Sequence, residues 1–207
     1  RRREIDGPVV AVTGTNGKTS TKEMLALTLG TRFRVHATRA NLNNLIGVPL
    51  TILEAPADTE ALVIEAGASV PGEIARYRQI IEPTVAVVTN VAAGHLEGFG
   101  SLEGVLREKL SLVEGAPLAV VGTDPPALAA GARQLARRVV TAGLEGAELR
   151  PESVTIDLTG RATVVTEQSR FTLPLPGRHL AANAMLAMAV GRHLGLDPRA
   201  VGRALER

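Results

Sequence analysis

The sequence predicts an α/β fold: a mostly parallel sheet with helices on both faces, plus a small antiparallel β segment near residues 151–176. Three observations support this prediction. Short apolar runs rich in Val and Ile recur along the chain, helix-like stretches lie between them, and the pattern changes to short antiparallel strands from Pro151. Apolar strands that alternate with helices are typical of a parallel sheet buried on both faces.

Five apolar runs predict the strands of the main sheet, and four helix-like stretches alternate with them. The strands are expected at residues 9–13, 61–66, 85–89, 118–121 and 139–141. The helices are expected at residues 19–29, 72–81, 102–113 and 127–138. Gly30 ends the first of these helices, as glycine commonly does. The order of elements therefore predicts strand–helix–strand units joined by short connections.

The remainder of the chain predicts a smaller substructure. Short antiparallel strands are expected at residues 154–160, 161–167 and 170–177, followed by an alanine-rich helix from about 179 to 193. Asp197 and Pro198 begin another short helix, because Asp is a good N-cap and proline is tolerated at the first helical position. We find no linker long enough to split the chain and no internal repeat. A single domain spanning residues 1–207 is therefore expected.

Composition limits the classes of function. A chain of 207 residues with 45% hydrophobic content can bury a substantial core. The net charge of +2, the 2% aromatic content and the lack of a basic block beyond residues 1–3 argue against a nucleic-acid surface. The absence of cysteine excludes disulfides, thiolate metal sites and a cysteine nucleophile. No apolar run approaches the ~20 residues of a membrane span, and no signal-peptide pattern is present. A monomeric cytoplasmic protein without a nucleic-acid partner is expected.

The stretch GTNGKT, residues 14–19, resembles a phosphate-binding loop with unusual spacing. In the common loop G-x-x-x-x-G-K-[ST] the first glycine would fall at position 12, but Gly14 lies only three residues before Gly17. The stretch follows an apolar strand and opens a helix, a context in which backbone N–H groups can cradle phosphates. Lys18 can then reach the phosphate charge, and the Thr19 hydroxyl can hold Mg²⁺. This pattern predicts a P-loop-type site; the alternative is a tight turn with a solvent-facing lysine.

Glu65 and the scarce lysines are further candidates. Glu65 ends a predicted strand, where α/β sheets bind ligands, and a carboxylate there suits Mg²⁺. The alternative for Glu65 is a paired structural carboxylate. Only three of the 23 basic residues are lysines, namely Lys18, Lys22 and Lys109. An amine can be modified or act as a compact phosphate partner where a guanidinium cannot, so each lysine is a candidate.

Five segments taken together resemble the central domain of the Mur ligase family. They read GTNGKT, ANLNNLIGVPLTIL, VIEAGASVPGEI, TNVAAGHLEGFGSLEGV and LPGRHLAANAM, in this order along nearly the whole chain. The loop alone indicates only an ATP-dependent ligase. The NNLIGVP and HLEGFGSL stretches are similar to those of the family members that add D-alanyl-D-alanine, so the resemblance is specific.

The resemblance implies ATP and Mg²⁺ as cofactors and assigns the site residues. The ATP-binding residues would be Gly14, Thr15, Asn16, Gly17, Lys18, Thr19, Ser20 and Asn183. The metal ligands would be Thr19, Glu65, His95 and a carbamylated Lys109. Lys18, His95 and Lys109 would be catalytic, and Asn41, Asn43 and Asn44 would lie on the substrate side.

Alternatives remain for several of these residues. An imidazole is not the hard ligand that Mg²⁺ prefers, so the role of His95 rests on the resemblance. Lys109 could be a solvated helix lysine, and Asn43 and Asn44 could form turns or cap a helix. The family motif G-x-H-N-x-x-N has Leu180 in place of its first asparagine, so one polar contact of the usual pattern is either missing or supplied by another residue.

The implied activity is amide formation in peptidoglycan precursor synthesis. The substrates would be UDP-N-acetylmuramoyl-tripeptide and D-alanyl-D-alanine, joined through an acyl phosphate. Residues 1–207 would form only the central ATPase domain, without the N-terminal uridine-nucleotide domain and the C-terminal closing domain. Two alternatives stay open. One is the central domain of another Mur-type ligase, such as a tripeptide-forming enzyme, a folylpolyglutamate synthase or a cyanophycin synthetase. The other is a nucleotide-binding module without catalytic activity.

Overall fold

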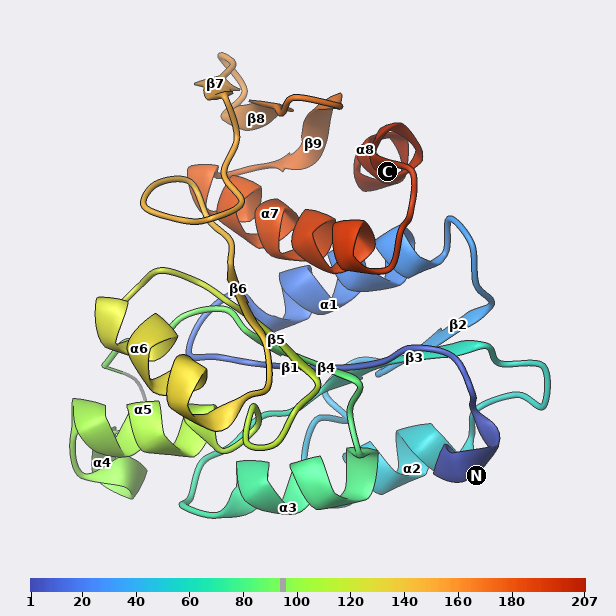
Figure 1. The fold of residues 1–207 in the computed structure, drawn as a ribbon, viewed down its shortest axis with the longest axis vertical. Coiled ribbons are helices and arrows are strands. Elements are labelled where there is room, and N and C mark those ends of the chain that lie inside the picture. The colour runs from blue at the N-terminus through green and yellow to red at the C-terminus, as the bar shows by residue number, and fades with distance from the viewer. Residues whose placement is uncertain (94–95) are drawn as a thin grey trace.

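The computed structural model describes residues 1–93 and 96–207, with the side chains of residues 96 and 97 left undescribed (Figure 1). Its main sheet has six parallel strands in the order β2-β3-β1-β4-β5-β6. They are β1 Val9–Thr13, β2 Val35–Ala37, β3 Ala61–Glu65, β4 Val85–Val88, β5 Leu118–Val121 and β6 Val139–Thr141. The predicted parallel α/β fold is therefore confirmed.

Helices cover both faces of this sheet (Figure 1). One face carries α1 Lys18–Leu29 and α7 Arg178–His193, with α8 Pro198–Leu205 packed against both helices. The other face carries α2 Gly47–Leu53, α3 Glu73–Ile81, α5 Leu102–Leu110 and α6 Pro126–Leu135, with the short α4 Leu96–Phe99 beside α5. Alternate residues of β1 enter opposite cores: Val10 and Val12 face α1 and α7, whereas Val9 and Ala11 face the other layer. The alternation follows from the two-residue period of a strand.

The small antiparallel sheet lies on the outer side of α7 (Figure 1). Its strands are β7 Ser153–Ile156, β8 Arg161–Val165 and β9 Arg170–Pro176, paired in chain order. Phe171, Leu173 and Val164 point from it into the core that contains α7 and α8. The antiparallel segment predicted near residues 151–176 is confirmed.

Some element ends follow the expected local chemistry. The Asp197 carboxylate accepts hydrogen bonds from Arg199 N and Ala200 N at 3.2 Å, so it caps α8 as predicted. The helix expected at residues 102–113 ends at Leu110 instead and continues as a tighter turn, in which Val113 N bonds to Leu110 O. None of the helices in the described ranges combines the length and apolar character needed to cross a bilayer.

Besides the 3-10 helix η1 Arg2–Glu4, three elements were not predicted from the sequence. Strand β2 has only three residues and includes His36, so it lacks an apolar run. Helix α2 contains Pro49 in its first turn, where the missing proline N–H is tolerated because it would have no intrahelical partner. Helix α4 has four residues, too few to show helical periodicity.

Candidate functional site

Residues 14–19 connect the carboxyl end of β1 to the start of α1, in the context predicted from the sequence. Both glycines of this loop are required by its geometry. Gly17 has φ 77°, and a Cβ there would lie 2.8 Å from Asn183 Nδ2. Gly14 has φ 148°, and a Cβ there would lie 1.9 Å from Thr89 Oγ1. Gly17 is also the N-cap of α1 and has no side chain that could occupy the first N–H groups of the helix, so these groups are available to bind phosphates.

The segment after β4 holds this loop in shape. Thr15 N donates to Asn90 O at 3.0 Å, and Asn16 N donates to Asn90 Oδ1 at 3.1 Å. The Thr89 hydroxyl donates to Asn16 O at 2.6 Å. Neither Asn90 nor Thr89 was among the site residues predicted from the sequence. Asn90 therefore supports the loop with both its backbone and its side chain.

Lys18 lies over the loop instead of facing solvent. Its ammonium donates to Gly14 O at 3.0 Å and to Thr15 O at 2.9 Å. Burial lowers the pKa of Lys18, and the nearby Glu65 carboxylate opposes that shift. Lys18 is therefore half-buried rather than solvent-facing, and phosphate binding by the loop stays a prediction.

Glu65, the last residue of β3, is 2% exposed and has an incomplete set of partners. Its Oε1 accepts from Thr19 Oγ1 at 3.2 Å and from Asn43 Nδ2 at 2.9 Å. Among the described residues, its buried Oε2 has no hydrogen-bond partner. A buried carboxylate oxygen without a partner is costly, unless the oxygen serves a ligand. This oxygen and the Thr19 hydroxyl are the hard ligands that Mg²⁺ prefers.

The described residues do not gather three or more His, Asp or Glu side chains into a metal centre. Glu65 and Thr19 would therefore supply only part of a Mg²⁺ coordination shell, as is usual where phosphate oxygens and waters complete it. The predicted ligand His95 lies outside the described residues. Its role stays a prediction.

Lys109, near the end of α5, shares the site with Lys18. It is 2% exposed, so the alternative of a solvated helix lysine is wrong. Its amine lies 5.7 Å from the centroid of the Phe99 ring. Burial, followed by repulsion from the Lys18 ammonium, lowers the pKa of Lys109 to about 8. At pH 8 roughly half of the Lys109 side chains are therefore neutral amines, against about 0.4% for an ordinary lysine. A neutral amine is the form that can react with CO₂ to give a carbamate.

Asn183 lies on the other side of the loop, in α7. It is buried, and among the described residues its Nδ2 has no hydrogen-bond partner. It lines a pocket of about 550 Å³ together with Asn16, Gly17 and residues after β5 and β6. A pocket next to a phosphate-binding loop, with an unpaired amide on its wall, suits a base with hydrogen-bonding edges. Leu180 is buried in the core with α1 and α7, so its replacement of the family asparagine removes a polar group from a packed position.

The three candidate asparagines before α2 occupy different positions. Asn43 reaches Glu65 with its side chain and accepts Gly67 N on its carbonyl at 2.8 Å. The Asn44 Oδ1 accepts Ile46 N at 3.1 Å and Gly47 N at 2.8 Å, the geometry of the helix-capping alternative. Asn41 is exposed on the surface. The substrate-side assignment of all three stays a prediction, and Asn43 alone contacts the carboxylate of the site.

The other predicted loop residues lie at the edges of the site. The Thr15 hydroxyl accepts Ala92 N at 3.0 Å, so it supports the loop. Ser20 is half-buried in the first turn of α1. Sequence reasoning missed Thr38, whose hydroxyl accepts Glu65 N at 2.9 Å and fixes the end of β3. No signal marked Thr38, because it follows the unpredicted strand β2.

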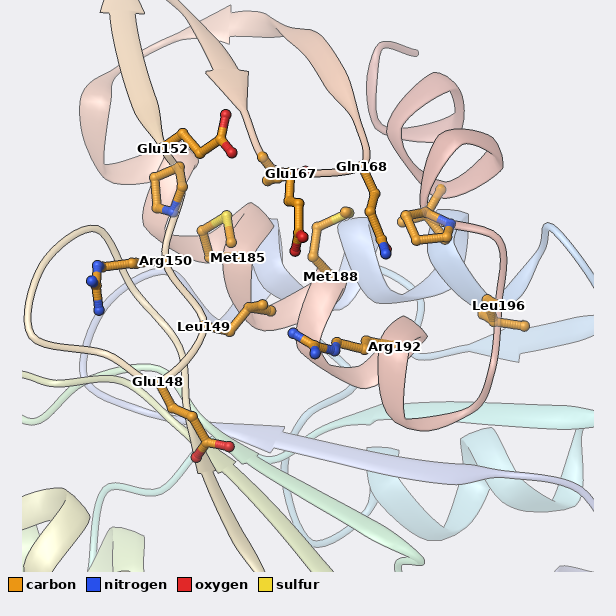
Figure 2. A pocket seen from close by; sticks show the side chains of 14 residues that line it. Glu148, Leu149, Arg150, Glu152, Glu167, Gln168, Met185, Met188, Arg192 and Leu196 are labelled. Atoms are coloured by element: carbon orange, nitrogen blue, oxygen red, sulfur yellow. The ribbon is translucent and has the colours of Figure 1, made fainter.

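A larger cavity of about 690 Å³ lies away from the loop, between α7, the segment before β7 and the turn that joins β8 to β9. Figure 2 shows carboxylates of Glu152 and Glu167 and the guanidinium of Arg192 around Met185 and Met188. Its charged groups have both signs and surround an apolar floor. The helix start in its lining, Pro198 of α8, is already capped by the Asp197 carboxylate, and its lining contains no glycine. The cavity is therefore the poorer nucleotide candidate.

Comparisons with known proteins agree with this geometry. The Mur ligase middle domain family matches residues 12–191. The UDP-N-acetylmuramoyl-tripeptide–D-alanyl-D-alanine ligase of Bacillus subtilis is 36% identical over 208 residues, which cover 98% of this chain and 45% of that protein. A crystal structure of MurF from Acinetobacter baumannii has a TM-score of 0.89 at 32% identity and covers 100% of this chain and 47% of its own. The structure of MurF ligase from Thermotoga maritima in complex with ADP has a TM-score of 0.84 at 32% identity. The match covers 99% of this chain and 50% of that protein chain. The chain spans about half the length of the curated relatives that it matches.

Proposed function

This chain belongs to the Mur ligase family, and from that premise we propose that it is the central ATP-binding domain of a ligase that adds D-alanyl-D-alanine to UDP-N-acetylmuramoyl-tripeptide. Solved and curated relatives with that activity are 32% to 36% identical to this chain along nearly its whole length. The observation that carries the proposal is the convergence of Lys18, Thr19, Glu65 and Lys109 on one loop at the carboxyl ends of β1 and β3.

The geometry supports a specific placement of ATP. The phosphates would lie over residues 14–19, bound by the first N–H groups of α1 and by the Lys18 ammonium. The adenine would enter the 550 Å³ pocket beside Asn183. Thr19, Glu65 and carbamylated Lys109 would hold Mg²⁺, which would neutralise charge on the transferring phosphoryl group.

The reaction follows from this placement. A substrate carboxylate attacks the γ-phosphorus of ATP, the bond from that phosphorus to the bridging oxygen breaks, and ADP leaves with the electron pair. The amine of D-alanyl-D-alanine then attacks the acyl carbon and phosphate leaves, after the amine has lost a proton. Lys18 stabilises the negative charge on the phosphoryl oxygens in the first step. The residues of this chain thus serve the phosphoryl-transfer half of the reaction.

The 207 residues alone are expected to bind Mg-ATP without forming the amide bond. The relatives are about twice as long, so we propose that uridine-nucleotide binding and closure over ATP belong to other segments of the natural gene product. Without closure, water reaches the acyl phosphate and the reactants are not oriented. To test this, the 207-residue chain and the complete gene product are each incubated with ATP, Mg²⁺, UDP-N-acetylmuramoyl-tripeptide and D-alanyl-D-alanine. The pentapeptide product is detected by its mass.

Three results of this assay, or of the same assay with other substrates, would contradict the proposal. Ligation of a different acceptor by the complete gene product, such as glutamate onto a folate, would place it elsewhere in the family. Nucleotide binding without any ligation by the complete gene product would favour the non-catalytic module. Product from the 207-residue chain at rates typical of whole enzymes, on the order of 10 s⁻¹, would show that the proposed division of labour is wrong.

A further inference from the structure

Glu108 is a buried carboxylate with an unusual pair of partners. It precedes Lys109 in α5 and is 7% exposed. Its Oε2 accepts Gly72 N at 2.8 Å, and its Oε1 accepts Ile74 N at 2.8 Å. Both N–H groups belong to the start of α3, where a helix has no acceptors of its own and favours negative charge. Glu108 therefore caps a helix other than its own.

This contact fixes the rotation of α5 about its axis. Consecutive residues of an α-helix point about 100° apart, because the helix has 3.6 residues per turn. The next side chain, Lys109, is buried on another side of α5, with its amine 5.7 Å from the centroid of the Phe99 ring and near enough to Lys18 for the two positive charges to repel each other. Among the described residues, the Lys109 amine has no hydrogen-bond partner. It lies over the ring of Phe99. The direction of Lys109 thus depends on the helix that bears it.

The start of α3 is itself tied to Glu65. Residues 66–72 lead directly from the end of β3 to α3, and Gly67 N donates to Asn43 O at 2.8 Å within this connection. The Glu73 carboxylate accepts Ser69 N at 2.7 Å and Val70 N at 3.0 Å, which further holds the connection. Glu108 therefore connects α5, which carries Lys109, to the segment that follows Glu65 in the chain.

We propose that Glu108 is a positioning residue, which holds α5 against the start of α3 and so keeps the Lys109 amine in the nucleotide site, near Lys18. The inference rests on the proposed function, in which Lys109 serves that site. A purely structural role for Glu108 would stabilise the fold without a particular effect on Lys109. The two roles differ in what happens to Lys109 in the folded protein.

The test uses the small number of lysines in this chain. Folded protein is pulsed with acetic anhydride, and peptide mass spectrometry gives the acetylation of Lys109 relative to Lys22. Lys22 is an internal reference, since it is also 2% exposed but lies in α1 and donates to Thr38 O at 2.9 Å. We expect Glu108→Ala to raise this ratio about tenfold, as loss of hydrogen bonds to a buried charge allows local opening. Glu108→Gln keeps one acceptor and is expected to give an intermediate ratio. Glu103→Ala, on the exposed first turn of α5, is the matched control and is expected to leave the ratio unchanged.

An unchanged ratio in Glu108→Ala, with a lower melting temperature, would overturn the proposal and leave Glu108 as a structural cap. If Glu108→Ala does not fold, the ratio in Glu108→Gln decides in the same way. Ligation by the complete gene product then separates this inference from the proposed function. If the acetylation ratio rises in a Glu108 variant and that variant has a lower kcat at unchanged KM for ATP, both the positioning role of Glu108 and the proposed function are supported. A raised ratio with normal turnover supports the positioning of Lys109 by Glu108 and contradicts the catalytic role of Lys109.

Discussion

Replacing Lys18 by methionine is expected to weaken the binding of Mg-ATP by about 2 kcal/mol, roughly a thirtyfold rise in Kd. The reason is the position of the ammonium, which is half-buried directly over residues 14–19 and held by two backbone carbonyls. A charge-assisted contact with phosphate made there is only weakly screened by solvent. Methionine keeps most of the length of the side chain but removes the charge and its donors. Calorimetric titration of the 207-residue chain measures the effect.

The control for this variant removes a positive charge elsewhere. Arg32 follows α1 on the exposed surface, and its guanidinium lies over the Phe33 ring at 5.4 Å from the ring centroid. Arg32→Met therefore changes the net charge by the same amount without touching the loop. Equal weakening by the two substitutions would mean that nucleotide is attracted by overall charge. Unchanged affinity in Lys18→Met would contradict the assignment of the loop.

Glu65→Gln is expected to stabilise the metal-free protein by about 1 kcal/mol while removing most of the effect of Mg²⁺ on ATP affinity. The amide oxygen can still accept from Thr19 and Asn43, as Oε1 does in the native protein. The substitution removes a buried negative charge whose Oε2 lacks a partner among the described residues. A neutral amide is also a much weaker ligand for Mg²⁺ than a carboxylate. Thermal unfolding gives the first effect, and titrations with and without Mg²⁺ give the second.

The matched control is Glu54→Gln, an exposed carboxylate at the end of α2. This substitution is expected to change the free energy of unfolding by less than about 0.5 kcal/mol. It is also expected to leave the effect of Mg²⁺ on ATP affinity unchanged. If Glu65→Gln responds to Mg²⁺ like the native protein, Glu65 is a structural carboxylate and the metal binds elsewhere. Opposite changes in stability and metal response are characteristic of a residue retained for function.

The sequence was sufficient to predict the parts of the fold that depend on continuous apolar runs. Strands β1, β3, β4, β5 and β6 were predicted in this way, because strands buried on both faces consist mainly of apolar side chains. Strand β2 was missed, since pairing with β3 rather than its own composition makes it a strand. Helix α2 was missed because its proline and glycine suggest a turn.

The candidate site was predictable to a similar degree. The loop and Glu65 could be located because each follows directly from a strand end. The burial of Lys109 depends on the packing of α5 beside α3 and α6, which no local pattern reveals. The contacts from Thr38 and Glu108 are likewise tertiary, since each joins residues at least 27 positions apart. The sequence thus identifies the groups of the site, whereas the structure identifies the residues that hold them.

The most direct test of the nucleotide site is a crystal structure of this chain with Mg²⁺ and a non-hydrolysable ATP analogue. The predicted result has phosphate oxygens within hydrogen-bond distance of the Lys18 ammonium and of the first N–H groups of α1. Mg²⁺ lies between the Thr19 hydroxyl and the Glu65 carboxylate, and the base lies in the pocket beside Asn183. Nucleotide bound instead in the cavity of Figure 2, lined by Glu167, Met188 and Arg192, with the loop unoccupied, would contradict the account.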